Sequence, residues 1–201
     1  RYCCNAEGGE EMSAYVRTLL GGGSVEPPAP EYEQIVNYTM LYDSGVDFIT
    51  LGNHSFKRPE VLEYLDKESA IIRPYNFPDG ASGKGVGIID KGRYRIAVIN
   101  LMGTVYLEAL NNPFYEADKA LKEIEDCKTV IVDFHAEATA EKICLGRFLS
   151  ELGVMVFVGT HTHVQTADSQ ILNNGTGYIT DLGMTGPIDS VLGVKKEIII
   201  N

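Results

Sequence analysis

From residue 45 onward, short runs rich in β-branched residues alternate with stretches in which apolar residues have helical spacing. This alternation is typical of an α/β fold, in which helices connect the strands of a sheet. The predicted helices are Arg58–Lys67, Tyr115–Cys127 and Ala140–Leu152. The predicted strands are Val46–Leu51, Gly85–Asp90, Tyr94–Leu101, Thr129–Phe134, Val154–Val158, Gly177–Thr180 and Glu197–Ile200. The hairpin expected over residues 85–101 is antiparallel, so we expect mixed sheets.

The length of the chain is sufficient for one hydrophobic core. Its 201 residues are 44% apolar, and we therefore expect a single domain over residues 1–201. The residues Tyr2-Cys3-Cys4 have the composition of a strand. A Gly-rich tract at residues 21–24 is followed by a Pro-rich tract at residues 27–30, which predicts a flexible insertion at about residues 8–33.

The charge and the cysteine pattern exclude several classes of partner. A formal net charge of −11 argues against binding to duplex DNA or to an anionic membrane surface. An anionic substrate would then need a local positive centre, which a bound metal ion could supply. No apolar run approaches the roughly 18 residues that span a bilayer, and the four cysteines form no CxxC pair. These features predict a soluble protein of the reducing cytoplasm.

All four histidines fall in three short segments, and each segment directly follows a predicted strand. The segments are Gly52-Asn53-His54, Asp133-Phe134-His135-Ala136-Glu137 and Gly159-Thr160-His161-Thr162-His163. In α/β sheets, ligands bind in the crevice beyond the carboxyl ends of the strands. We therefore expect the imidazoles to meet at one rim of the sheet.

His161 and His163 are two residues apart. In an extended backbone, both rings would project to the same side, about 6.5–7 Å apart along the strand. Such a pair can bind one metal ion, or two ions about 3.5–4 Å apart as in two-metal hydrolases. The alternative, two surface histidines in a polar loop, would be favoured if the other histidine segments were absent.

The other two segments offer further candidate ligands. The amide oxygen of Asn53 suits a hard metal ion, and His54 beside it could protonate a leaving oxygen. His135 follows a strand apolar enough to be buried, with Asp133 or Glu137 available to orient its ring. Each residue also has a structural alternative. Asn53 could form a turn by bonding its own backbone, and His54 could be a buried ring bonded to a backbone carbonyl. Glu137 could be a residue in the first turn of the next helix, where its negative charge interacts favourably with the helix dipole.

Taken together, these segments resemble the calcineurin-like metallophosphoesterases, and specifically the bacterial YmdB-like group of cyclic-nucleotide phosphodiesterases. The resemblance covers about residues 43–197 and rests on SGVDFITLGNHSF, RPYNFPDGASGKG, AVINLMGT, VDFHAEATAEK, VGTHTHVQTAD and GYITDLGMTGP. It implies an α/β sandwich of two mixed sheets flanked by helices (α/β/β/α). It also implies two divalent or mixed-valence metal ions, iron or manganese, with zinc compatible as well.

The resemblance also implies roles for individual residues. Asn53, His135, His161 and His163 resemble metal ligands, and His54 resembles the histidine that assists the leaving group. The implied reaction is hydrolysis of 2′,3′-cyclic nucleotides, or of related phosphodiesters such as RNA ends, by a metal-bridging hydroxide. We also expect a homo-oligomer.

The N-terminal part departs from the family pattern. In Asn5-Ala6-Glu7-Gly8, Glu7 matches the carboxylate that bridges the two metals, but Gly8 stands where the family has an asparagine ligand. The family's first-strand Gly-Asp motif is not found before Tyr2. The alternative function is therefore a catalytically impaired member that acts as a nucleotide- or protein-binding scaffold.

Overall fold

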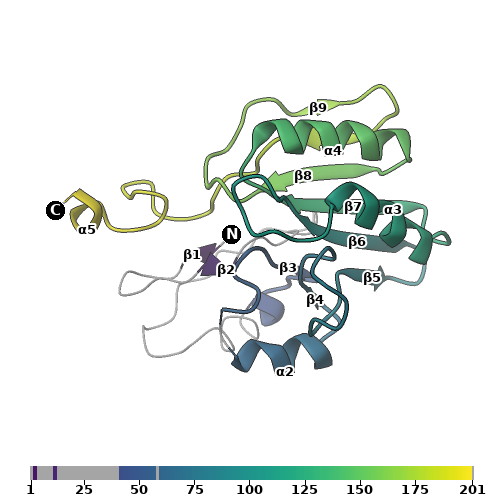
Figure 1. Cartoon of the computed structure of the whole chain (residues 1–201), viewed down its shortest axis with the longest axis horizontal. Coiled ribbons are helices and arrows are strands. Elements are labelled where there is room, and N and C mark those ends of the chain that lie inside the picture. Colours follow the sequence, from purple (N-terminus) through teal and green to yellow (C-terminus); the bar gives the residue numbers. More distant parts are fainter. Residues whose placement is uncertain (1, 4–10, 13–40, 58, 201) are drawn as a thin grey trace.

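The computed structural model describes residues 2–3, 11–12, 41–57 and 59–200 (Figure 1). The helices are α2 (Glu60–Lys67), α3 (Pro113–Glu123), α4 (Thr139–Glu151) and α5 (Lys196–Ile200). The strands are β1 (Tyr2–Cys3), β2 (Glu11–Met12), β3 (Ile49–Thr50), β4 (Ile71–Ile72), β5 (Val86–Asp90), β6 (Arg95–Met102), β7 (Thr129–His135), β8 (Val156–Thr160), β9 (Gln170–Ile171) and β10 (Gly177–Ile179).

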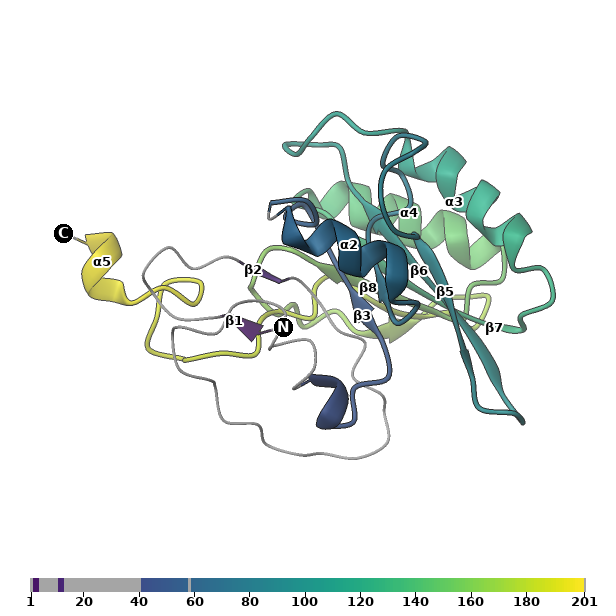
Figure 2. The same cartoon turned by 90° about the horizontal axis from the view of Figure 1, so that it is seen from below.

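The main sheet is mixed. Within the described residues its strand order is β5-β6-β7-β8-β10-β9. The four inner strands are parallel, and β5 and β9 at the two edges run antiparallel to their neighbours. Helix α3 connects β6 to β7 and α4 connects β7 to β8, and both cover the same face of the sheet (Figure 1, Figure 2). The predicted α/β class, with a mixed sheet and flanking helices, is confirmed.

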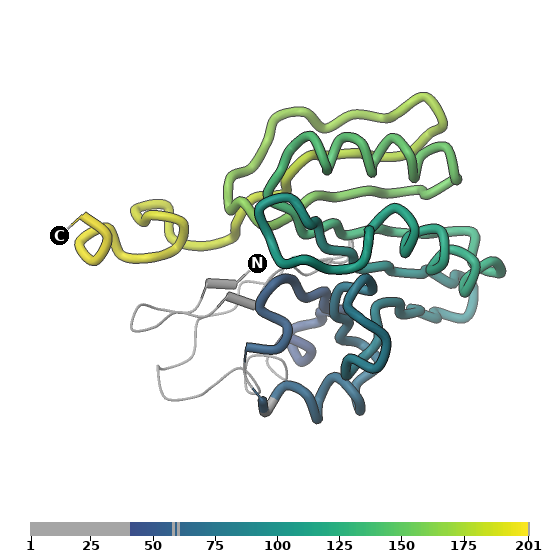
Figure 3. The backbone as a smooth tube through the Cα atoms, in the orientation of Figure 1, coloured from purple at the N-terminus to yellow at the C-terminus, as the bar shows by residue number. Residues whose placement is uncertain are grey.

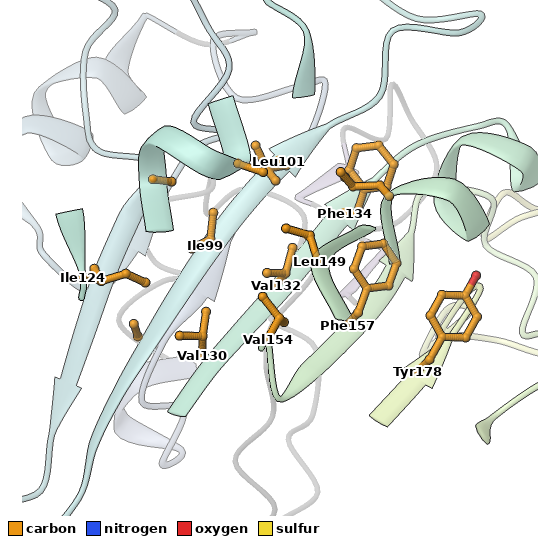
Figure 4. Packing of buried hydrophobic residues seen from close by; sticks show 14 of the residues in the cluster. Ile99, Leu101, Ile124, Val130, Val132, Phe134, Leu149, Val154, Phe157 and Tyr178 are labelled. Atoms are coloured by element: carbon orange, nitrogen blue, oxygen red, sulfur yellow. The ribbon is translucent and has the colours of Figure 1, made fainter. Parts of the chain in front are cut away.

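The face of the sheet beneath α3 and α4 carries the main hydrophobic core (Figure 4). Side chains alternate between the two faces along a strand. On β7, Val132 and Phe134 point into this core, so Asp133 and His135 point to the opposite face. Ala117 of helix α3 and Ile124, directly after its last residue, belong to this core.

The opposite face is covered by the segment that carries β3 and β4. These two strands form a separate parallel pair, and Phe48 and Ile72 pack on Val98 of β6. A Cβ atom on Gly87 would lie 2.1 Å from Cζ of Phe48, so the absence of a side chain at Gly87 lets the Phe48 ring approach the sheet. This contact fixes the chain just before the turn at residues 52–56.

Most predicted elements are observed with shifted ends. The hairpin formed by β5 and β6 has the expected antiparallel register and turns through Gly92 at a φ of 71°. Helix α3 begins two residues earlier than predicted because Asn112 caps it, accepting a hydrogen bond from the Phe114 N–H at 2.9 Å. The predicted strand Val46–Leu51 is shorter, and its regular part is β3.

The predicted strand Glu197–Ile200 is wrong, since these residues lie in α5. The three isoleucines of α5 are each more than half exposed. No described strand pairs with this segment. A helix bonds its own backbone groups, whereas a strand without a neighbour leaves them unpaired. The C-terminal segment that ends in α5 extends away from the sheet, as the yellow end of the tube in Figure 3 shows.

Two predictions concern residues that the structure mostly leaves undescribed. Glu7 lies outside the described residues, and so does the predicted insertion at about residues 8–33, apart from β2. β1 pairs antiparallel with β2, in line with the strand-like composition of Tyr2-Cys3-Cys4. Among the described residues, no helix has the length and apolar character needed to cross a membrane.

Candidate metal centre

Three candidate ligands from three different elements converge at the carboxyl ends of the strands. Asn53 lies in the turn after β3, His135 is the last residue of β7, and His161 directly follows β8. Oδ1 of Asn53 lies 2.8 Å from Nε2 of His135, and Nδ1 of His161 lies 3.0 Å from the same nitrogen. The two rings meet edge to face, with centroids 4.7 Å apart. The predicted gathering at one rim is therefore observed for these three residues.

The hydrogen bonds of His135 determine which ring nitrogen carries the proton. Nδ1 of His135 lies 3.2 Å from Oγ1 of Thr160, and that hydroxyl donates its proton to Oδ1 of Asp133 at 2.8 Å. Because the hydroxyl proton is already used, Thr160 accepts from Nδ1–H of His135. We therefore assign the proton to Nδ1 and the lone pair to Nε2.

The same reasoning applies to His161. Its Nε2 lies 3.1 Å from Oε2 of Glu137, which as a carboxylate can only accept. A neutral His161 therefore carries its proton on Nε2 and its lone pair on Nδ1, the atom that faces His135.

Three electron-pair donors thus lie within hydrogen-bond distance of one another: the amide oxygen of Asn53, Nε2 of His135 and Nδ1 of His161. With neutral rings, neither contact has a proton, and a metal cation would satisfy all three lone pairs. Imidazole nitrogen and amide oxygen are suitable ligands for divalent transition metals. These residues therefore fit a metal ion by their chemistry.

A buried carboxylate links the three strands that lead into this cluster. Asp133 is 1% exposed and accepts a second hydrogen bond, at 2.6 Å, from Oγ1 of Thr50 on β3. Thr50 lies three residues before Asn53, and Thr160 directly precedes His161. Asp133 therefore orients His135 through Thr160. Glu137 contacts His161 instead of His135, so of the two carboxylates expected to orient His135, Asp133 is the one that does.

The backbone after β8 is not extended, so the predicted geometry of the His161 and His163 pair is wrong. His161 has a φ of 106° and His163 a φ of 65°, both in the left-handed region. Nδ1 of His163 donates to the carbonyl of Leu192 at 2.9 Å, which places the lone pair of this ring on Nε2. His161 and His163 therefore have different partners.

The remaining candidates are less defined. His54 is half-buried in the turn after Asn53, and its carbonyl accepts a hydrogen bond from the Lys57 N–H at 3.2 Å. Among residues 2–3, 11–12, 41–57 and 59–200, no group of three His, Cys, Asp or Glu side chains surrounds a common point. The described part of the cluster is thus two imidazoles and one amide.

Comparison with known proteins shows the family of this chain. The family described as YmdB-like protein matches residues 34–201. The chain belongs to the YmdB-like family. The matched region contains every candidate ligand except Glu7.

Individual relatives of the YmdB-like chain carry names of phosphate-ester hydrolases. It is 46% identical over 164 residues to a 2′,3′-cyclic-nucleotide 2′-phosphodiesterase of Bacillus subtilis, covering 81% of this chain and 62% of the relative. A crystal structure of a novel phosphatase from Mycoplasma pneumoniae has a TM-score of 0.74 and 34% identity, covering 83% of this chain and 61% of that one. A hypothetical protein from Thermus thermophilus has a TM-score of 0.77 and 38% identity, covering 82% and 64%.

The chain spans 59–62% of the length of the curated relatives it matches. The activity of a whole relative is therefore not carried over by similarity alone.

Sequence reasoning missed three polar residues that bond to the candidate cluster or to its neighbours, namely Thr50, Thr160 and Asp181. Thr50 and Thr160 were detectable in part, because each is a polar residue at the end of an apolar strand just before a candidate ligand. Asp181 had no such local signal, since its partners lie 19 and 39 residues away.

Proposed function

We propose that the protein is a metal-dependent phosphodiesterase that hydrolyses 2′,3′-cyclic nucleotides or related phosphodiesters, RNA ends included. The observation that carries this proposal is the convergence of Asn53 Oδ1, His135 Nε2 and His161 Nδ1, a donor set that suits a divalent metal ion. The names of the Bacillus subtilis and Mycoplasma pneumoniae relatives support the substrate class.

Asn53, His135 and His161 would hold one metal ion. In this proposal His163, through Nε2, and Glu7 complete a centre of two ions, iron or manganese, with zinc also compatible with such donors. When bound, the ions supply a Lewis acid for the phosphoryl oxygens and a more acidic water as nucleophile. With a net charge of −11, the protein gains in this centre the local positive charge that an anionic substrate needs.

The protein's own groups orient the centre and complete the reaction. Asp133, through Thr160, keeps the lone pair of His135 on Nε2, and Glu137 does the same for Nδ1 of His161. His54, beside Asn53, would donate a proton to the departing ribose oxygen.

The test is a paired measurement on wild-type protein and His54→Ala after anaerobic loading with Mn²⁺ or Fe²⁺. We expect about two ions per chain by elemental analysis in both proteins. We also expect metal-dependent hydrolysis of bis-p-nitrophenyl phosphate and 2′,3′-cyclic AMP that His54→Ala abolishes. Full hydrolysis by His54→Ala would refute the role of His54.

A wild-type protein that binds metal and nucleotide without turnover would favour the alternative, a binding scaffold. One ion per chain would limit the centre to Asn53, His135 and His161. A cytoplasmic location and a homo-oligomeric state remain predictions, and size-exclusion chromatography with light scattering tests the latter.

A further inference from the structure

The carboxylate of Asp181, just after β10, is a buried group near the candidate centre that accepts several hydrogen bonds. It is 1% exposed, and its Oδ2 accepts from Nζ of Lys142 at 2.7 Å. The same oxygen accepts from the N–H of Thr162 at 3.2 Å and from its hydroxyl at 2.8 Å. Oδ1 accepts from the N–H of Gly183 at 2.7 Å. Asp181 thus binds one cation and three neutral donors.

Thr162 is the residue between His161 and His163, whose φ angles are both positive. Residues other than glycine seldom adopt such a backbone, and it persists only where the surroundings hold it. Asp181 binds Thr162 through both its backbone and its side chain. The carboxylate is therefore placed to hold the strained turn between the two histidines.

The side chain of Lys142 extends from α4 to Asp181 and passes close to Gly159. Both side chains of the pair are buried, with exposed fractions of 0% and 1%. A Cβ atom on Gly159 would lie 3.0 Å from Cδ of Lys142 and 1.7 Å from the carbonyl oxygen of Thr180. Gly159 therefore provides the space for the lysine stem and for the chain that leads into Asp181.

We propose that Asp181 and Lys142 are a positioning pair for the histidine turn. Lys142 offsets the charge of the buried carboxylate. Asp181, through Thr162, holds the turn in which His161 faces His135 and His163 faces Leu192. Neither residue touches a reacting atom. This inference rests on the proposed function, because the turn matters only if its histidines bind metal.

The hydroxyl of Thr162 separates positioning from simple stabilisation. Thr162→Val removes the hydroxyl bond to Asp181 and leaves the ion pair with Lys142 intact. Thr162→Ser keeps the hydroxyl and serves as the rescue variant. Thr176→Val is the matched control, because it removes the buried hydroxyl that Thr176 shares with Ser150 and Val154, away from the turn.

The experiment uses the full chain and two readouts besides activity: the Kd for Mn²⁺ by titration calorimetry, and the ring ¹⁵N signals of the histidines in metal-free protein. For Thr162→Val we expect a Kd raised roughly tenfold, with shifted signals of His161 and His163. Thr162→Ser should restore wild-type values, and Thr176→Val should leave both readouts unchanged even if its stability falls.

The outcomes separate this inference from the proposed function. Wild-type Kd and wild-type ring signals in Thr162→Val would overturn the positioning role, whatever the activity. If the wild-type protein binds Mn²⁺ but hydrolyses no phosphodiester, the proposed function fails while the Kd values still decide the positioning role. If the wild-type protein binds no Mn²⁺, the ring ¹⁵N signals of His161 and His163 in Thr162→Val decide the positioning role. Asp181→Asn should have a larger effect than Thr162→Val, and should it fail to fold, the Thr162 variants carry the test.

Discussion

Replacing Lys142 by methionine isolates the energetic role of its buried ion pair. The ammonium and the Asp181 carboxylate are 2.7 Å apart and almost fully excluded from solvent. Removing one partner of such a pair leaves a buried charge uncompensated, which costs about 3–5 kcal/mol. Thr162 and Gly183 would still donate three hydrogen bonds to the carboxylate. We therefore expect a loss near the lower limit, about 3 kcal/mol.

Urea denaturation followed by circular dichroism measures this loss directly. For a chain of this size, 1 kcal/mol corresponds to about 2–4 °C in Tm. A loss of about 3 kcal/mol therefore predicts a Tm lower by about 6–12 °C. Lys67→Met is the matched control, because Lys67 pairs with Glu63 on the exposed face of α2, and we expect no measurable loss there.

A loss below about 1 kcal/mol in Lys142→Met would refute the reasoning. It would mean that water reaches Asp181 when the lysine is absent. A loss of equal size in Lys67→Met would show that the effect does not come from burial.

Three further measurements test other parts of the molecule. Mn²⁺ at one hundred times its Kd should raise the free energy of unfolding by about 2.7 kcal/mol, and Asn53→Ala should lose most of this gain; an undiminished gain would contradict the site. Gly159→Ala should lower the urea midpoint, because the added Cβ would lie 1.7 Å from the carbonyl oxygen of Thr180. Gly177→Ala is the control and should leave the midpoint unchanged, because its added Cβ would lie 3.8 Å from the nearest atom. Equal midpoints in the two variants would contradict the close packing at Gly159. Burial raises the pKa of Asp168, but the hydrogen bonds it accepts outweigh burial and lower that pKa below its ordinary value. The stability from this shift is present above about pH 4 and lost as the pH falls through the folded-state pKa, so Asp168→Asn should flatten the acid side of the stability profile, and an unchanged slope would refute this.

Local sequence patterns were sufficient to predict the frame of the site. The apolar run before His135 identifies β7, and the turn residues after Asp90 identify the β5–β6 hairpin. Strand periodicity reports which residues share a face, and parallel strands bring their carboxyl ends to one rim. The approach of His135 and His161 follows from these two rules. Asn53 follows β3 of the separate β3–β4 pair, and the packing of that pair on the main sheet brings it to them.

Local patterns were not sufficient where the backbone depends on distant residues. The spacing of His161 and His163 suggested an extended chain, but the structure has two left-handed residues with Thr162 bound to Asp181, 19 residues away. The isoleucines of α5 had strand composition, yet strand formation depends on a neighbour to pair with.

The sequence by itself therefore determined the α/β class, the rim where the candidate ligands gather, and their chemical types. The tertiary structure alone decided which lone pairs face one another and how the histidine turn is held. The physical reason is the separation along the chain of the residues involved. Side-chain periodicity is a property of a few consecutive residues, whereas the Thr50–Asp133 and Lys142–Asp181 contacts join residues 83 and 39 positions apart and form only when the strands pack.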